Sequence, residues 1–256
     1  MKLRVLGAYG SEGVSQRPSS FLINGKTLID AGCTSSALTV SEQLHIEHAL
    51  ISHTHLDHVA GLAFLTETMA LSGHAPSFLT ISSIDSVVKG LRSCFFSGVV
   101  WPDFTKIPTA KQPVVKFRDL EENAEQQVGD LMVRPVSVSH TVPAAGFIVH
   151  DGSNGLVYSG DTGPTHALWK AARNVGQIDA VILECSYPNR FGWVAKTSKH
   201  MTPELVEREL DKLPSDVTVF IFHIKPQFYE ETADELNRIN SRQVVIVEQD
   251  KTYDLD

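Results

Sequence analysis

Residues 53–58 have the sequence His-Thr-His-Leu-Asp-His, which places three imidazoles and one carboxylate within six residues. The segment follows an apolar run at 49–51 and precedes a helical pattern that starts near Val59. A strand-to-helix turn can present several metal ligands at once, and imidazole with carboxylate suits zinc, manganese or iron. Structural zinc sites usually contain cysteine, so this cysteine-free cluster favours an open, catalytic metal site over a solvated polar loop.

Three further residues of metal-ligand type each follow an apolar, strand-like run. They are His140, Asp161 and His223. Gly160 and Gly163 would let the backbone turn sharply around Asp161. Any one of the three could be non-functional by itself. Because side chains at strand ends emerge on one rim of a sheet, we expect them to join the cluster at 53–58 in a two-metal site.

Composition limits the function classes. The 256 residues carry a net charge of −8, which argues against a general affinity for nucleic-acid backbone, since that needs a basic face. No stretch approaches the roughly 20 apolar residues of a membrane span, and the N-terminus does not resemble a signal peptide. The three widely spaced cysteines indicate a reducing compartment. We therefore predict a cytoplasmic protein without a membrane or nucleic-acid polymer as partner.

Many strands and fewer helices predict a single domain over residues 1–256, with two sheets between helices. The predicted strands are 2–6, 20–29, 48–52, 77–81, 131–138, 145–150, 155–159, 179–185, 217–222 and 243–248. The predicted helices are 59–72, 84–94, 164–175, 202–213 and 230–239. In the helix at 202–213, Thr202 is the expected N-cap and Pro203 the first residue. The least regular stretch, 95–127, is a surface excursion or a lid or pocket wall.

The segment 52–58, with the later His140, Asp161 and His223, resembles the metallo-β-lactamase superfamily. This resemblance implies an α/β fold, the αββα four-layer sandwich of two mixed β-sheets flanked by helices, with the metal site at the sheet edge. It also implies the ligands of two ions. One ion would be held by His53, His55 and His140, the other by Asp57, His58 and His223, with Asp161 as the bridge.

A narrower resemblance, to class II cyclic-nucleotide phosphodiesterases, extends over most of the chain. It is carried by residues 53–62, 96–104, 158–164, 184–189, 198–203 and 223–226, and above all by Trp101-Pro102, Ser198-Lys199-His200-Met201-Thr202-Pro203 and His223-Ile224-Lys225-Pro226. It implies that a metal-bridging hydroxide cleaves the 3′ phosphodiester bond of 3′,5′-cyclic AMP or cyclic GMP, giving a 5′-monophosphate. The expected cofactors are two divalent ions, most simply zinc, with manganese or iron as alternatives. A homodimer is the oligomeric state expected from relatives.

His200 is the candidate proton donor to the leaving oxygen, because it resembles the histidine of the His-x-Thr element in related phosphodiesterases; a surface histidine is the alternative. Asp57 is counted with it among the catalytic residues, as a metal ligand. Asp30 is either a partner that orients a ligand histidine or a turn residue. Glu184 is a second candidate partner. His166 is expected to be an exposed helix residue.

Candidate substrate contacts come from two segments. Thr162 and Gly163 would offer a hydroxyl and backbone N–H groups to a phosphate, or would only shape the turn. Phe96, Trp101 and Phe104 would form a stacking wall for a purine, or would belong to the core.

Three rival functions stay open. A tRNase Z-like RNA endonuclease of the same superfamily would use the same metals, but the net charge of −8 disfavours it. A lactonase, arylsulfatase or other esterase is disfavoured only by the narrower resemblance. A non-enzymatic binding protein would usually have lost metal ligands, and every expected ligand is present.

Overall fold

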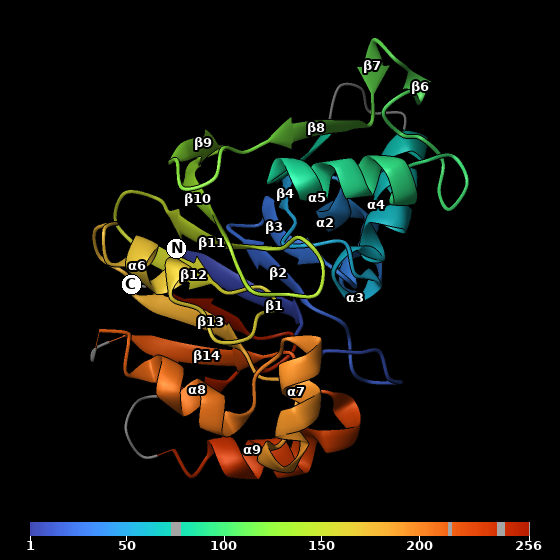
Figure 1. Ribbon diagram of the computed structural model, residues 1–256. Coiled ribbons are helices and arrows are strands. Elements are labelled where there is room, and N and C mark those ends of the chain that lie inside the picture. The colour runs from blue at the N-terminus through green and yellow to red at the C-terminus, as the bar shows by residue number, and fades with distance from the viewer. Residues whose placement is uncertain (73–77, 215–216, 240–243, 256) are drawn as a thin grey trace.

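The computed structural model describes residues 1–72, 78–214, 217–239 and 244–255. Two seven-stranded sheets pack face to face, and helices cover the outer face of each (Figure 1). Each sheet is mixed, with three antiparallel pairs on one side and three parallel pairs on the other. The predicted αββα sandwich is therefore confirmed.

The first sheet has the order β16-β1-β2-β3-β4-β5-β8. Its strands are β1 (Lys2–Gly7), β2 (Ser20–Ile23), β3 (Thr27–Ala31), β4 (His48–Leu50), β5 (Leu79–Ser83), β8 (Val115–Asp119) and β16 (Thr252–Asp254). The second sheet has the order β15-β14-β13-β12-β11-β10-β9. Its strands are β9 (Gln126–Val128), β10 (Leu131–Ser137), β11 (Ala145–His150), β12 (Gly155–Tyr158), β13 (Ala180–Glu184), β14 (Thr218–Phe222) and β15 (Val244–Ile246). A separate hairpin pairs β6 (Pro108–Thr109) with β7 (Gln112–Pro113).

The helices fall into two groups by position along the chain. The N-terminal group is α1 (Thr34–Ala37), α2 (Val40–Gln43), α3 (Leu56–Val59), α4 (Gly61–Leu71) and α5 (Asp85–Gly90), which continues as the π-helical turn η1 (Leu91–Phe95). The C-terminal group is α6 (Ala167–Ala172), α7 (Gly192–Ser198), α8 (Pro203–Leu210) and α9 (Tyr229–Leu236), with the short turns η2 (Asn189–Phe191) and η3 (Pro226–Phe228). Figure 1 shows α4 and α5 beside the first sheet, at the top, and α8 and α9 beside the second, at the bottom.

The layer between the sheets contains an aromatic trio. Phe21 from the first sheet meets Tyr158 and Phe222 from the second, with ring centroids 5.7 and 5.4 Å away. A second core lies outside the second sheet, where Trp169 of α6 and Val206 of α8 are fully buried. Full burial of an apolar side chain contributes about 1.5–3 kcal/mol, so these two cores fix the strand ends that carry the site.

Several sequence predictions differ from the structure in detail. The run at 20–29 is a hairpin of two strands, because Asn24 and Gly25 both have positive φ (49° and 74°), as a tight two-residue turn requires. The irregular stretch 95–127 contains β8 and the first two residues of β9, and these two strands form edges of the two sheets. The predicted strands 77–81 and 243–248 begin at residues that lie outside the described part of the chain.

The helix predicted at 202–213 begins with Thr202 and Pro203 as expected and ends at Leu210. The Thr202 side chain does not cap it. Instead, the Asn189 side chain accepts a hydrogen bond from the Glu204 N–H (2.8 Å). Among the described residues, no helix is both long enough and apolar enough to cross a membrane.

Candidate metal centre

The candidate ligands lie at the ends of strands, where the two sheets meet. The loop after β4 carries His53 and His55 into α3, whose first turns contain Asp57 and His58. From the second sheet, His140, Asp161 and His223 follow β10, β12 and β14. His223 has a φ of 73°, an uncommon left-handed backbone that is consistent with a constrained position.

The structure brings all seven predicted ligands together in two adjoining groups. In each group the candidate ligand atoms lie within 4.8 Å of one another, and Asp161 belongs to both. The first group is His53, His55, His140 and Asp161; the second is Asp57, His58, Asp161 and His223. This is the arrangement that the family resemblance implies.

Three imidazoles converge on one carboxylate oxygen. The Oδ2 atom of Asp161 lies 3.2 Å from Nε2 of His223, 3.3 Å from Nε2 of His58 and 3.7 Å from Nε2 of His53. On the opposite side of the second group, Nε2 of His223 lies 3.4 Å from Oδ2 of Asp57.

Two buried atoms in this centre have no hydrogen-bond partner within the described chain: Nε2 of His53 and Oδ1 of Asp161. Leaving a buried polar atom unsatisfied costs about 1–3 kcal/mol. A lone pair on nitrogen and a carboxylate oxygen are both ligands for a divalent cation. The donor set therefore fits two divalent ions, although it does not distinguish zinc from manganese or iron.

Four of the five candidate ligand histidines have a lowered pKa, which favours the neutral form that binds metals. Burial lowers the pKa of His53 well below its usual range and also lowers the pKa of His55 and His223. Burial likewise lowers the pKa of His140 to about 4.

The carboxylate at the centre stays ionised. Burial opposes the charge of Asp161, but the nearby His223 and His58 outweigh it and hold its pKa well below the usual range. Burial also opposes a charge on His58, whereas Asp161 and Asp30 raise its pKa well above the usual value. Asp161 thus keeps a negative charge at the junction of the two ligand groups, where it could bind a cation.

Asp30 is the partner that orients His58. It is fully buried at the end of β3, and its carboxylate accepts four hydrogen bonds. The donors are the Ser52 N–H (2.7 Å), the Ser52 hydroxyl (2.7 Å), His58 Nδ1 (2.6 Å) and the Tyr158 hydroxyl (2.6 Å). Because Nδ1 of His58 donates to Asp30, Nε2 is the ring nitrogen left to bind a metal ion in the second ligand group.

Glu184 supports the other side of the centre. Its Oε1 accepts from His200 Nδ1 (2.8 Å) and from the Thr162 N–H (3.1 Å). Its Oε2 accepts from the Ser186 hydroxyl at 3.0 Å, and that hydroxyl lies 2.9 Å from His223 Nδ1. Glu184 therefore fixes the orientation of His200 and, through Ser186, contacts a predicted metal ligand.

Some residues at the centre were not predicted. Ser52, Tyr158 and Ser186 hold the ligands or their partners, yet a serine or tyrosine in a strand end carries no distinctive sequence signal. Lys225 lies with Nζ 3.9 Å from Oδ2 of Asp57. In the sequence, Lys225 stands out only as part of the segment His223-Ile224-Lys225-Pro226, which resembles class II cyclic-nucleotide phosphodiesterases.

The predicted phosphate contacts shape the turn around Asp161. The Thr162 hydroxyl donates to the Gly163 carbonyl (2.7 Å), and the Gly163 N–H donates to the Ser139 carbonyl (2.9 Å). The Thr162 N–H is bound to Glu184. Their role toward a phosphate stays a prediction.

The predicted aromatic wall lies partly in the core. Phe96 and Phe104 are 2% and 5% exposed and pack in the core cluster that includes the first sheet and its helices. Trp101 is half-buried and contacts Phe64 of α4, with ring centroids 5.5 Å apart. Base stacking by these rings stays a prediction, and Trp101 has the most accessible surface of the three. His166 is exposed, as expected.

Comparison with known proteins places this geometry in a family. Residues 26–224 match the model of the Beta-lactamase superfamily domain. A probable 3′,5′-cyclic-nucleotide phosphodiesterase from Yersinia pestis is 30% identical over 212 residues, covering 72% of this chain and 59% of that protein. The chain thus spans about three fifths of that relative's length. A 3′,5′-cyclic-nucleotide phosphodiesterase from Aliivibrio fischeri is 27% identical over 276 residues, covering 84% and 79%.

Solved structures share the fold along the whole chain. Unliganded yeast PDE1 has a TM-score of 0.79 at 17% identity, with 98% of each chain covered. The metallo-beta-lactamase fold protein YhfI from Bacillus subtilis has a TM-score of 0.78 at 18% identity, with 99% of each covered. Human tRNase Z, short form, has a TM-score of 0.70 at 18% identity, with 100% of each covered. The matched range contains all seven candidate ligands, and the chain belongs to the beta-lactamase superfamily domain family.

Proposed function

We propose that this protein is a di-metal phosphodiesterase that hydrolyses the 3′ phosphodiester bond of 3′,5′-cyclic nucleotides to give 5′-monophosphates. The observation that carries the proposal is the pair of ligand groups joined through Asp161. Two relatives with the names of cyclic-nucleotide phosphodiesterases support the substrate class. Cyclic AMP and cyclic GMP are both candidate substrates.

The two groups would each hold one divalent ion, most simply zinc, with Asp161 as the bridge. When bound, such a pair supplies a water of lowered pKa and positive charge for the phosphate oxygens. Asp57 acts as a ligand of the second ion. Lys225, with its ammonium 3.9 Å from Asp57, adds a positive charge at the edge of that group.

His200 is the proposed proton donor to the 3′ oxygen of the leaving ribose. It is 7% exposed, and its ring lies between the two ligand groups, 5.1 Å from the His140 ring and 5.3 Å from the His223 ring. Glu184 occupies Nδ1, so Nε2 is the ring atom that would carry the proton to the substrate.

The other proposed contacts follow from the sequence. Thr162 and Gly163 are proposed to line the phosphate, although their N–H groups donate within the protein. Trp101, Phe96 and Phe104 are one candidate surface for the base, and within the described chain the buried Nε1 of Trp101 has no hydrogen-bond partner. The homodimer and the cytoplasmic location also stay predictions.

The test is turnover of cyclic AMP and cyclic GMP by zinc-loaded protein, with products separated by chromatography and a chelator-treated control. A precursor tRNA and a lactone panel run in parallel. We expect chelator-sensitive formation of the 5′-monophosphate. RNA or lactone turnover without cyclic-nucleotide hydrolysis would reject the proposal in favour of a tRNase Z-like nuclease or an esterase.

The role of His200 has its own test. His200→Gln should keep both ions but lower turnover, and the loss should be greater for ribose esters than for p-nitrophenyl esters, whose leaving group needs no proton. His166→Gln is the matched control, since His166 is exposed on the turn that begins α6. Equal losses on both ester classes would exclude proton donation.

A further inference from the structure

A row of aromatic rings leads outward from His200. The Tyr187 ring lies 5.9 Å from the His200 ring and 6.2 Å from the Phe228 ring. The Phe191 ring lies 4.8 Å from Phe228. Tyr187, Phe191 and Phe228 are all half-buried, so each presents some ring surface to solvent. We call these three residues the 187–228 wall.

The wall begins next to the metal ligands. His200 stacks on His223, with planes 19° apart and centroids at 5.3 Å, and Tyr187 contacts the His200 ring at an interplanar angle of 70°. Only one ring therefore separates the wall from a predicted ligand. The wall is therefore close enough to the centre to contact a second group on a ligand whose phosphate is bound there.

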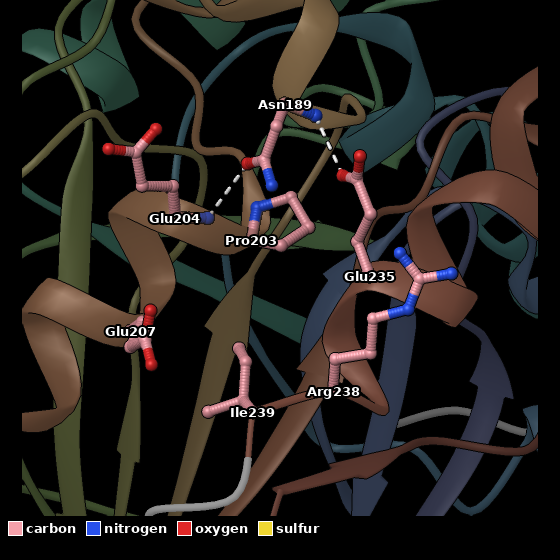
Figure 2. Close-up of a pocket in the computed structure, with 7 residues that line it drawn as sticks. All are labelled: Asn189, Pro203, Glu204, Glu207, Glu235, Arg238 and Ile239. Atoms are coloured by element: carbon pink, nitrogen blue, oxygen red, sulfur yellow. Dashed lines mark hydrogen bonds between the residues drawn. The ribbon is translucent and has the colours of Figure 1, made fainter.

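The segment 187–191, which carries two of the three rings of the wall, is held in place by α8 and α9. The Asn189 N–H donates to Glu235 of α9 (2.7 Å), and the Asn189 side chain caps α8 at Glu204, as Figure 2 shows. The Arg190 guanidinium lies 4.2 Å from the centroid of the Phe191 ring and is paired with Glu231 of α9 (2.7 Å). The rings are thus organised before any ligand binds, which lowers the entropic cost of binding.

The groove behind this segment does not suit an anionic ligand. It is lined by Glu204, Glu207 and Glu235, with Arg238 as its cation (Figure 2). The three carboxylates would repel a phosphate. Glu204 and Glu235 instead hold Asn189 by hydrogen bonds. On the aromatic side, Tyr187 contacts His200 of the centre.

We propose that the 187–228 wall is the surface on which the nucleobase of the substrate stacks, an inference that rests on the proposed cyclic-nucleotide activity. Every base has a π-face, and stacking on aromatic side chains tolerates different bases. The guanidinium of Arg190 stiffens the wall from the side of Phe191. The wall would therefore select nucleotides over simple phosphodiesters without a strict choice between adenine and guanine.

This surface competes with Trp101 for the role. Trp101 contacts Phe64 on α4, and within the described chain no ring contact joins it to a histidine of the centre. The 187–228 wall has such a contact, through Tyr187 and His200. The two candidate surfaces can be separated by substitution.

The experiment compares metal-loaded variants on cyclic AMP and on methyl riboside 3,5-cyclic phosphate, which lacks a base but has the same reacting bond. Phe191→Leu and Phe228→Leu keep apolar volume and remove the ring face. We expect KM for cyclic AMP to rise about 10-fold or more in each, with kinetics on the baseless ester unchanged. Phe64→Leu is the matched control, and Trp101→Leu tests the rival surface.

A second readout does not need turnover. Dissociation constants for 5′-AMP and ribose 5-phosphate, measured by calorimetry, should differ about 10-fold or more in the unmodified protein and converge in Phe191→Leu. Two results would contradict stacking on the 187–228 wall. One is an equal loss of activity on cyclic AMP and on the baseless ester in Phe191→Leu and Phe228→Leu. The other is a loss specific to cyclic AMP that occurs in Trp101→Leu alone. If no cyclic nucleotide is hydrolysed but the tighter binding of 5′-AMP over ribose 5-phosphate depends on Phe191, the proposed function is wrong and base stacking on the 187–228 wall is supported.

Discussion

Replacing Asp30 with asparagine tests whether the metal centre depends on a buried hydrogen-bond network. Asp30 is fully buried and has a φ of 52°, a backbone region that asparagine also adopts readily. The substitution keeps shape and volume. It removes the charge and replaces one acceptor oxygen with an NH₂ group.

We expect the NH₂ group of asparagine to take the place of Oδ2, because the backbone N–H of Ser52, which binds Oδ1, cannot rotate away. Oδ2 accepts from the Ser52 hydroxyl, His58 Nδ1 and the Tyr158 hydroxyl. Oδ1 still accepts from the Ser52 N–H. The two hydroxyls can rotate, whereas the imidazole N–H cannot. At about 1–3 kcal/mol for each unsatisfied buried group, we expect a loss of about 3 kcal/mol in the free energy of unfolding.

The change also reaches the metal through the tautomer of His58. An NH₂ group opposite Nδ1 favours the tautomer with its proton on Nε2, and Nε2, which lies 3.3 Å from Asp161, then has no lone pair with which to bind a metal ion. Partners that orient ligand histidines are worth about 10- to 100-fold in metal affinity. We expect one of the two ions to bind more weakly by about that factor.

The assays are urea unfolding of chelated protein and a competitive titration with a chromophoric chelator. Thr27→Val is the matched control: Thr27 is buried on the same strand, and its hydroxyl has no partner within the described chain, so its removal should leave stability unchanged or raised. Unchanged affinity for both ions in Asp30→Asn would refute the tautomer argument, even if stability fell.

Three further predictions concern single side chains. Asp161→Ala should bind fewer than two ions by elemental analysis and lose nearly all turnover; two retained ions would contradict the bridge. Burial lowers the pKa of His140 to about 4 in the folded chain. This histidine therefore takes up its proton in the unfolded chain first as pH falls from about 6.5 to 4, and by itself it should cost metal-free protein up to about 1.4 kcal/mol of stability per pH unit in that window. His140→Gln should reduce the dependence of the free energy of unfolding on pH, and an unaltered dependence would contradict this contribution of His140. Cys94 is exposed and should react with a thiol reagent in native protein, whereas Cys33 and Cys185 are buried and should react only on unfolding; three equal rates would contradict this.

The sequence was most informative where one short segment carried its own signal. The six residues 53–58 and the polar residues that follow apolar strands, such as Asp161, could be located because strand ends place side chains on one rim. The same reasoning predicted two sheets between helices. The same reasoning did not predict β8 or β9. Prolines at 102, 108 and 113 precede β8, and an acidic run separates β8 from β9, so neither short strand has a clear pattern in the sequence.

The supporting groups could not be predicted, because they depend on contacts between distant parts of the chain. Asp30 and Tyr158 are 128 residues apart and meet only when the two sheets pack. Tyr187 and Phe228 come from different connections of the second sheet. A single sequence records neither pairing, whereas the local cluster of histidines needs no long-range information to be seen.

Hydrolysis of 3′,5′-cyclic AMP by metal-loaded protein in ¹⁸O-labelled water is the decisive experiment on the proposed reaction. Mass spectrometry of the product gives both the bond broken and the atom attacked. We expect 5′-AMP with one ¹⁸O in its phosphate, and no 5′-AMP from protein without metal. Formation of 3′-AMP, a label on the ribose, or no hydrolysis with two ions bound per chain would contradict it.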